Sequence, residues 1–241
     1  MSTDGVRAAP RGWRSAGDLW QSRGFPMGLY ARHVAPRMVS WVCGLGIYDG
    51  PRRTLVSAAR GRVLEIGMGS GHNLRFYDPA KVEMLWGLEP DATMRKLAAP
   101  RIAAAPVAVR LLDLPGEEIP LEDDAVDTVL STLTMCTIPD LARALAQVRR
   151  VLKPGGALLF LEHGEDPEEP VRRWQRRLEP AWKRFAGGCH LTRPIPRLIE
   201  DAGFRLERLE TWRLAGASGR FVPSALKALG SFDYAGAAAI D

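Results

Sequence analysis

At residues 63–71 the chain reads VLEIGMGSG, a short apolar segment that ends in an acidic residue and a glycine-rich turn. Glycine lets the backbone turn sharply and lets a ligand approach where a side chain would block it. The apolar residues at 62–66 predict a strand, and the three glycines predict a tight turn directly after it. A strand that runs into such a turn is a device that nucleotide-binding α/β folds share.

The spacing of these glycines favours one kind of cofactor over another. It is G-x-G-x-G after the acidic Glu65, which is typical of S-adenosylmethionine (SAM) binding. Dinucleotide-binding turns have the different spacing G-x-G-x-x-G. The carboxylate of Glu65 can pair with the ammonium group of SAM, directly or through water. An ordinary strand-to-helix turn is the alternative at this point, because a glycine-rich turn alone is weak evidence.

The rest of the chain alternates between strand and helix patterns. Apolar runs predict six further strands, at 83–88, 107–112, 126–131, 157–162, 204–212 and 230–238. Helical spacing predicts helices between them, at 71–78, 91–104, 139–152 and 194–202. Residues 153–156, KPGG, end the helix at 139–152, since proline cannot continue it and glycine supplies the turn. This order predicts an α/β fold with a doubly wound, mostly parallel, Rossmann-like sheet of seven strands.

Other helical segments lie outside this alternation. Residues 27–43 and 50–59 predict helices ahead of the first strand. After the fifth strand, residues 165–190 predict a helical insertion that is amphipathic and rich in arginine. Its apolar stripe consists of Val171, Trp174, Leu178, Trp182 and Phe185. Packing by this stripe is the simpler interpretation, and a lid over the substrate or a contact with a membrane surface is the alternative.

Size and charge bear on whether the protein binds nucleic acid or a membrane. The 241 residues carry a formal net charge of +5, and 28 Arg and 5 Lys are interleaved with acidic residues. No motif that reads DNA or RNA is present, so we expect no nucleic-acid partner. The weakly basic surface leaves peripheral membrane contact open. The longest apolar stretch near the N-terminus, at 38–48, is shorter than the roughly 20 residues that a transmembrane helix needs.

The three cysteines give no sign of a metal site. Cys43, Cys136 and Cys189 have no C-x-x-C spacing and form no zinc signature, so we expect no metal. A sparse, odd set of cysteines is typical of a protein in the reducing cytoplasm. Cys136 could act as a nucleophile after the fourth strand, but a small buried hydrophobic residue is the favoured interpretation.

Cofactor-binding residues are expected beyond the carboxyl ends of the strands, where open α/β sheets bind their ligands. Glu89 ends the second strand, 24 residues after Glu65, and its carboxylate can accept hydrogen bonds from both ribose hydroxyls. Gly116 and Glu117, after the third strand, are expected at the adenine edge. The residues after the fourth strand are expected under the methionine portion of SAM. The full predicted set is Glu65, Gly67, Met68, Gly69, Gly71, Asn73, Glu89, Pro90, Met94, Gly116, Glu117, Thr132 and Leu133.

Taken together, residues 61–163 resemble a class I SAM-dependent methyltransferase throughout, most clearly at 149–156, RRVLKPGG. A narrower likeness covers roughly residues 60–240. It lies in CT at 136–137, LEH at 161–163, PAW at 180–182 and GCHLTR at 188–193. These phrases are similar to the methyltransferase-like alkyl thiol S-methyltransferases and their bacterial relatives.

The resemblance implies SAM as the cofactor, S-adenosylhomocysteine as the product and a small thiol as the methyl acceptor. The acceptor would be a secondary-metabolite or xenobiotic thiol. The chain is expected to divide into an N-terminal helical extension at 1–60, which covers the active site, and a methyltransferase domain at 61–241. Animal members carry a hydrophobic membrane anchor that has no counterpart in this sequence. We therefore expect a cytoplasmic enzyme without a transmembrane segment, either a monomer or a homodimer.

For methyl transfer from SAM, the protein mainly has to position and desolvate the nucleophile. The sulfonium of SAM is a strong leaving group, and a thiol with an unperturbed pKa of about 8.5 needs only to become a thiolate. His163, at the end of the fifth strand, is the leading candidate for a base or substrate-orienting group. The alternative is a histidine that holds a loop. His190 and Arg193, after the inserted helix, are further catalytic candidates. Arg193 could pair with an acidic group of the substrate, or it could simply bind a loop carboxylate.

Other functions remain open on the sequence. Related class I enzymes methylate phospholipid amines and quinone-type carbons, so both acceptors are alternatives to a thiol. A binding module that keeps the SAM pocket without turnover is a third hypothesis. The intact residues around Glu65 and Glu89 argue against a decayed cofactor pocket, but they do not identify the acceptor.

Overall fold

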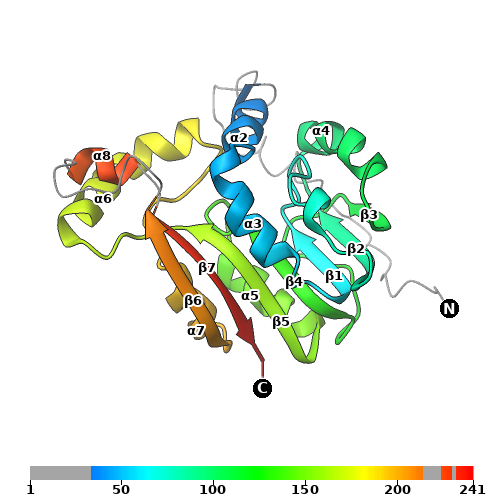
Figure 1. Ribbon diagram of the computed structural model, residues 1–241. Helices are drawn as coiled ribbons and strands as arrows, with labels where there is room; N and C mark the ends of the chain where they lie inside the picture. The colour runs from blue at the N-terminus through cyan, green and yellow to red at the C-terminus, as the bar shows by residue number, and fades with distance from the viewer. Residues whose placement is uncertain (1–33, 214–223, 230–231, 241) are drawn as a thin grey trace.

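The computed structural model describes residues 34–213, 224–229 and 232–240, and a seven-stranded sheet runs through it (Figure 1). The strand order is β3-β2-β1-β4-β5-β7-β6. Strands β1 to β5 run parallel, and β7 runs antiparallel to both β5 and β6. The bounds are β1 Gly61–Ile66, β2 Val82–Leu88, β3 Val109–Leu112, β4 Val126–Thr132, β5 Leu152–His163, β6 Arg205–Arg213 and β7 Phe232–Ala239. The predicted doubly wound, mostly parallel sheet is confirmed.

The helices and short 3₁₀ turns connect and flank these strands. They are α2 Ala35–Cys43, η2 Gly46–Tyr48, α3 Asp49–Val56, η3 Leu74–Phe76, α4 Ala92–Ala103, α5 Leu141–Val151, α6 Glu169–Phe185, α7 Ile195–Asp201 and α8 Ser224–Leu229. Figure 1 shows α3 over one face of the sheet and α5 and α7 over the other. None of the described helices is both long and apolar enough to cross a membrane.

The core has two layers because successive side chains of a strand point to opposite faces. Leu64 and Ile66 of β1 pack into the layer that contains α5 and α7. Val63 packs into the opposite layer, with Leu55 and Val56 of α3. Both faces of the parallel strands are therefore buried, which is why these strands read as continuous apolar runs in the sequence.

Two sequence predictions differ most from the structure at their boundaries. The helix expected at 71–78 is only the 3₁₀ turn η3, because the glycine turn and Asn73 occupy its first residues. For the helix expected at 27–43, the structure has α2 at Ala35–Cys43, and residues 27–33 lie outside the described residues. Strand β5 begins at Leu152, five residues before the predicted strand. Residues 153–156 therefore end α5 as predicted but belong to the strand, where the β4–β5 register shifts.

The inserted helix α6 is amphipathic as predicted, but its stripe is not a buried packing face. Val171 is fully buried, whereas Trp174 is 38% exposed and Phe185 is 56% exposed. Figure 1 shows α6 beside α8 and away from the sheet. Trp174 and Phe185 therefore keep part of their surface open to solvent.

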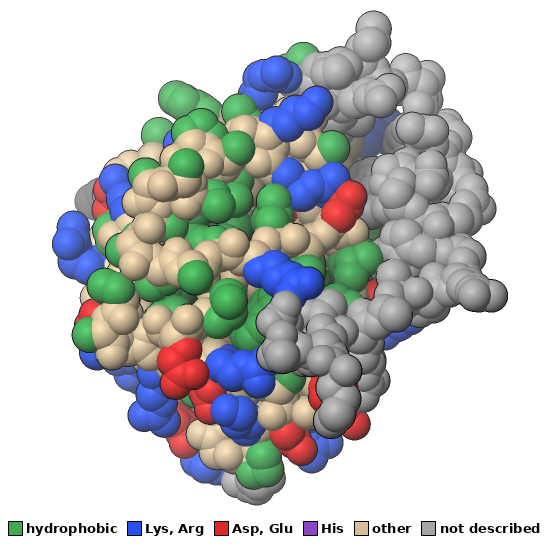
Figure 2. Space-filling view, turned by 90° about the vertical axis from the view of Figure 1, so that its right-hand side faces the viewer, with side chains coloured by type: hydrophobic (Ala, Val, Ile, Leu, Met, Phe, Trp, Pro, Cys, Tyr) green, Lys and Arg blue, Asp and Glu red, His purple; other side chains and the backbone are tan. Residues whose placement is uncertain are grey.

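Charged side chains are dispersed over the surface that carries β3 and α4. Figure 2 views the molecule from this side, and its basic side chains lie apart, among acidic, polar and apolar ones. The dispersion matches the interleaving of Arg with acidic residues along the sequence. A nucleic-acid-binding face would instead gather its basic side chains in a patch or stripe.

Candidate active site

The glycine turn after β1 has the backbone conformation that requires glycine. Gly67, Gly69 and Gly71 have φ angles of 62°, 58° and 81°, a region that other residues enter at a cost. A Cβ on Gly67 would stand 2.3 Å from the Thr134 side chain. A Cβ on Gly69 would meet nothing closer than 3.9 Å. The turn is therefore tightly packed at Gly67 and leaves open space beside Gly69.

Glu65 lies at the end of β1 and is fully enclosed by protein. Its Oε1 accepts a hydrogen bond from Nδ2 of Asn73, and its Oε2 accepts one from the Tyr77 hydroxyl, both at 2.8 Å. Burial raises the pKa of Glu65 to about 7, against the opposing effect of these hydrogen bonds. Sequence reasoning placed Glu65 here but missed Tyr77, which has no motif around it.

Asn73 links this carboxylate to the next strand end. Its Nδ2 also donates to Oγ1 of Thr132 at 2.8 Å. Its Oδ1 is buried and has no hydrogen-bond partner in the structure. A buried acceptor without a donor is costly, so this amide oxygen is the atom of the cluster that is best suited to accept from a bound ligand.

Glu89 lies at the end of β2, where the sequence places the acid that faces the ribose. Its Oε2 accepts from the Gly69 amide and its Oε1 from the Asp91 amide, both at 2.8 Å. Burial raises its pKa to about 7. The carboxylate thus ties the end of β2 to the glycine turn. Asp91 caps α4 by accepting from the Met94 amide at 2.8 Å.

Four of the other predicted cofactor residues are Met68, Pro90, Gly116 and Glu117. Met68 is buried, and its side chain fills the space above Gly87, so it offers a ligand its backbone rather than its thioether. Gly116 packs close to Ile66, and Glu117 Oε1 accepts from the Asp140 amide at 3.1 Å. Contact of Gly116 and Glu117 with adenine stays a prediction, as it does for Pro90.

Leu133, just after β4, adopts a conformation that is rare for its residue type. Its φ is 53°, and a left-handed conformation costs a residue with a Cβ about 1–2 kcal/mol. Its amide donates to the Leu161 carbonyl of β5 at 2.8 Å, which holds the strained residue in place. Strain of this kind gathers at ligand sites, in line with the expectation that Thr132 and Leu133 face the cofactor.

The loop after β4 is held by a buried carboxylate. Glu162 accepts from the Ser131 hydroxyl at 2.7 Å, from the Thr134 amide at 2.9 Å and from the Met135 amide at 3.1 Å. Burial raises its pKa to about 7. Arg193 donates to the carbonyls of Met135 and Ile138, on either side of Cys136. Arg193 therefore holds this loop, through backbone carbonyls rather than through the loop carboxylate that was the alternative from the sequence.

His163 ends β5 beside two cysteines. Its Nε2 lies 3.1 Å from Sγ of Cys189. Burial by itself lowers the pKa of His163, but the charge and hydrogen bond of Cys189 outweigh it and raise the pKa. The pKa of Cys189 is lowered in turn, first by its hydrogen bond with Cys136 and then by His163, while burial opposes the shift. The two groups therefore favour a thiolate–imidazolium pair.

His190 follows Cys189 in the loop between α6 and α7, but its side chain contacts Glu179 rather than His163. Its Nδ1 is 3.2 Å from Oε1 of Glu179, and its backbone amide donates to the Cys136 carbonyl at 2.9 Å. Burial lowers the pKa of His190. Sequence reasoning named His163 and His190 but missed Cys189 between them, although Cys189 stands in the GCHLTR phrase that carried the resemblance.

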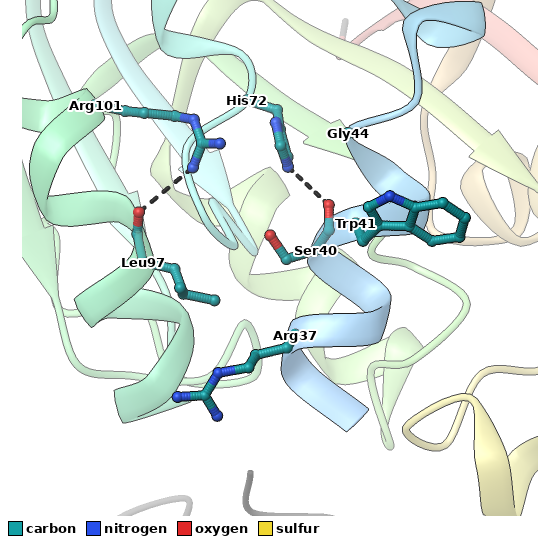
Figure 3. Close-up of a pocket in the computed structure, with 7 residues that line it drawn as sticks. All are labelled: Arg37, Ser40, Trp41, Gly44, His72, Leu97 and Arg101. Carbon is teal, nitrogen blue, oxygen red and sulfur yellow. Dashed lines mark hydrogen bonds between the residues drawn. The ribbon is translucent and has the colours of Figure 1, made fainter. Parts of the chain in front are cut away.

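A pocket of about 350 Å³ lies between α2, α4 and the glycine turn (Figure 3). His72 Nε2 is 2.9 Å from the Ser40 carbonyl oxygen of α2. Arg101 of α4 donates to the Ser70 carbonyl of the glycine turn at 2.9 Å. These bonds tie α2 and α4 to the turn, and Arg37 and Trp41 line the same space.

The sequence of this chain is similar to those of known methyltransferases. Residues 64–160 match a family model described as a methyltransferase domain. Thiol S-methyltransferase TMT1A of Homo sapiens is 34% identical over 186 residues, which cover 76% of this chain and 73% of that protein. Thiol S-methyltransferase TMT1B of Rattus norvegicus is 38% identical over 153 residues, covering 61% of this chain. The match spans 62% of the length of that TMT1B.

A solved structure supports the fold. An S-adenosylmethionine-dependent methyltransferase of Mesorhizobium loti matches with a TM-score of 0.58 at 19% sequence identity, over 82% of this chain and 99% of that one. At this identity the likeness shows the fold alone. This chain belongs to the class I SAM-dependent methyltransferases, in the family that contains the thiol S-methyltransferases TMT1A and TMT1B.

Proposed function

We propose that this protein transfers the methyl group of SAM to a small-molecule thiol, giving a methyl thioether and S-adenosylhomocysteine. The observation that carries the proposal is the 34% identity to thiol S-methyltransferase TMT1A over 73% of that protein. A secondary-metabolite or xenobiotic thiol is the acceptor class that we propose.

The residues around the glycine turn fit SAM. Open space lies beside Gly69, and the unpartnered Oδ1 of Asn73 can accept a hydrogen bond from the ammonium group. The buried Glu89, at the end of β2, would accept hydrogen bonds from the ribose hydroxyls. When bound, SAM supplies an electrophilic methyl group on a sulfonium. The protein's own part is to hold the methionine portion between the glycine turn and the strained residue Leu133.

The acceptor side is proposed to lie at the carboxyl end of β5. His163 is half-buried there and stands next to the loop after β4, which leads from Thr132 and Leu133 to Cys136. His163 would orient the acceptor. The N-terminal extension at 1–60 would cover this edge of the methyltransferase domain at 61–241, and α2, tied to the glycine turn through His72, supports that part of the proposal.

A phospholipid amine is the second candidate acceptor. The observation that favours it is the pair of exposed aromatic side chains on α6, Trp174 and Phe185, beside basic residues such as Arg177 and Arg184. A basic amphipathic helix with exposed aromatics suits an anionic membrane surface.

The test is methyl transfer by the purified protein with SAM and a panel of thiols, amines, phenols and quinols, with products read by mass spectrometry. We expect methyl thioethers in the absence of vesicles. Methylation of an amine lipid only when vesicles are present would overturn the thiol assignment in favour of the second candidate. SAM binding with no methylated product from any arm would contradict turnover itself.

A further inference from the structure

Three side chains with metal-binding chemistry converge beside the proposed acceptor site. They are Cys136 from the loop after β4, His163 from the end of β5 and Cys189 from the loop between α6 and α7. One ligand atom of each, two thiol sulfurs and an imidazole nitrogen, lies within 4.8 Å of the other two. Cys136 is 2% exposed and Cys189 is 6% exposed, while His163 keeps part of its surface open.

The spacing of these atoms suits a zinc ion. Zinc binds thiolate sulfur at about 2.3 Å and imidazole nitrogen at about 2.0 Å, so a tetrahedral site holds its ligand atoms roughly 3.5–3.8 Å apart. Cys189 Sγ lies 3.1 Å from His163 Nε2, and all three ligand atoms lie within 4.8 Å of one another, which leaves room for separations in that range.

The loops that carry the ligands are held in place by other contacts. Arg193 binds the carbonyls on either side of Cys136, and Glu162 accepts from the Thr134 and Met135 amides ahead of it. The His190 amide donates to the Cys136 carbonyl and so fixes the Cys189 loop against the Cys136 loop. A ligand set held in this way is organised before a metal arrives.

A carboxylate also stands next to the histidine. Asp233 of β7 is paired with His163 across the antiparallel β5–β7 ladder and is fully buried. Directly opposed residues in such a ladder have neighbouring side chains. Metal-binding histidines are commonly oriented by a carboxylate on the other ring nitrogen, and Asp233 is placed for that task.

We propose that Cys136, His163 and Cys189 bind one zinc ion, and that its fourth coordination position receives the sulfur of the acceptor thiol. Three protein ligands with an open fourth position is the arrangement of catalytic rather than structural zinc. The second half of this inference rests on the proposed thiol S-methylation. The first half, the metal site, stands on the geometry alone.

The step balances without an oxidant or reductant. The acceptor thiol gives its proton to solvent as its sulfur binds zinc, because zinc favours the thiolate form. The acceptor sulfur then forms a bond to the methyl carbon, while the bond from that carbon to the sulfonium breaks and its electron pair stays on S-adenosylhomocysteine. The neutral thioether is a weaker ligand than a thiolate and leaves the metal. His163 acts here as a ligand, so no separate base is needed.

The first test is metal binding by the full chain, without SAM or thiol. Zinc is measured by elemental mass spectrometry and by competition with a chromophoric chelator, and Co²⁺ loading is followed by thiolate-to-cobalt absorption. We expect one zinc per chain. Cys189→Ser and His163→Ala should weaken binding by about 100-fold or more, since each removes a direct ligand and loss of a mere supporting contact already costs about 10- to 100-fold.

Cys43→Ser is the matched control, because it removes the one cysteine outside the set and should keep full zinc content. Unfolding curves check that each variant folds, and the cobalt spectrum of the unaltered protein needs no variant at all. The site is refuted by zinc well below one per chain, by zinc content that survives Cys189→Ser, or by recovery of Cys136 and Cys189 as a disulfide without metal.

The second test separates the metal from the methyl transfer. Adding a small thiol to the cobalt-loaded protein should change the cobalt absorption, and chelator treatment should abolish thiol methylation until zinc is restored. Full thiol methylation by metal-free protein would overturn the role of zinc and leave the proposed function standing. A thiol-dependent cobalt spectrum with no methylated thiol would support the metal site while contradicting the proposed function.

Discussion

At the scale of single residues, the proposed cofactor site is built around two buried carboxylates and their hydrogen-bond partners. Glu65 is enclosed by Asn73 and Tyr77, and Glu89 is bound to two backbone amides. Each of these carboxylates has a pKa raised to about 7 by burial. The sequence predicted both positions, because each acid follows a recognisable strand. It could not predict their hydrogen-bond partners, which depend on how the turn folds back.

Glu65 should make the stability of the protein depend on pH. Its folded pKa of about 7 lies above the 4.5 of an unperturbed glutamate, so the folded protein keeps a proton that the unfolded chain releases between these values. The free energy of unfolding should therefore fall as pH rises through this window. Glu65→Gln keeps the contacts with Asn73 and Tyr77 and should flatten the decline. Chemical denaturation at pH 5 and pH 8 measures the free energy of unfolding of both proteins. If this free energy falls equally with pH in the parent protein and in Glu65→Gln, the raised pKa of Glu65 is contradicted.

Two glycines of the same turn should respond differently to alanine. Gly69→Ala carries the backbone cost of a positive φ, about 1–2 kcal/mol, and should in addition lower SAM affinity, since the added methyl enters the open space beside the turn. Gly67→Ala should mainly destabilise the fold, because its Cβ collides with Thr134 in addition to a backbone cost of about 1–2 kcal/mol. Calorimetric SAM titration and denaturant unfolding test the pair. Equal effects of both variants on both measurements would count against a ligand beside Gly69.

At the scale of elements, the loop after β4 connects the cofactor side to the acceptor side. It begins with the strained Leu133 and passes Cys136 before it reaches α5. Glu162 holds it from β5 and Arg193 from the loop before α7. Helix and strand patterns predicted the elements on both sides of this loop. The loop itself follows no period, so its anchors were visible only in the folded chain.

Arg193→Lys should loosen this loop. An ammonium group is a point charge and cannot reproduce the two-carbonyl contact of a guanidinium. We expect a stability loss of about 1–3 kcal/mol, faster amide hydrogen exchange at residues 133–138, and a lower kcat/KM. Arg184→Lys, at an exposed position of α6, is the matched control and should behave like the parent protein. Unaltered exchange in Arg193→Lys would show that the guanidinium does not hold the loop.

At the scale of the whole molecule, β7 completes the sheet by inserting between β5 and β6. The fit is close, because a Cβ on Gly236 would stand 2.3 Å from the Arg208 carbonyl oxygen and 2.7 Å from the Phe160 ring. The seven strands were predicted from the sequence, those of β1 to β5 as largely apolar runs. The insertion of the last strand between two earlier ones was not, since strand order depends on packing of the complete chain.

Gly236→Ala should therefore destabilise the protein without altering the affinity of the folded fraction for SAM. Overpacking of a buried position costs about 1–3 kcal/mol. Gly46→Ala, where an added Cβ meets nothing within 4 Å, is the control and should stay within about 1 kcal/mol of the parent. Thermal unfolding and SAM titration provide the two readouts. Equal stability of the two variants would show that the β5–β7–β6 contact is looser than the structure has it.

The sequence was sufficient for the class of fold, the cofactor and the positions of Glu65, Gly69 and Glu89, because strand periods and turn chemistry are local properties of the chain. The tertiary structure alone decided that Cys136, His163 and Cys189 meet. These residues lie 27 and 26 positions apart and share no motif spacing. They come together because β4 and β5 are adjacent parallel strands whose carboxyl ends share one edge, and because the loop between α6 and α7 returns to that edge.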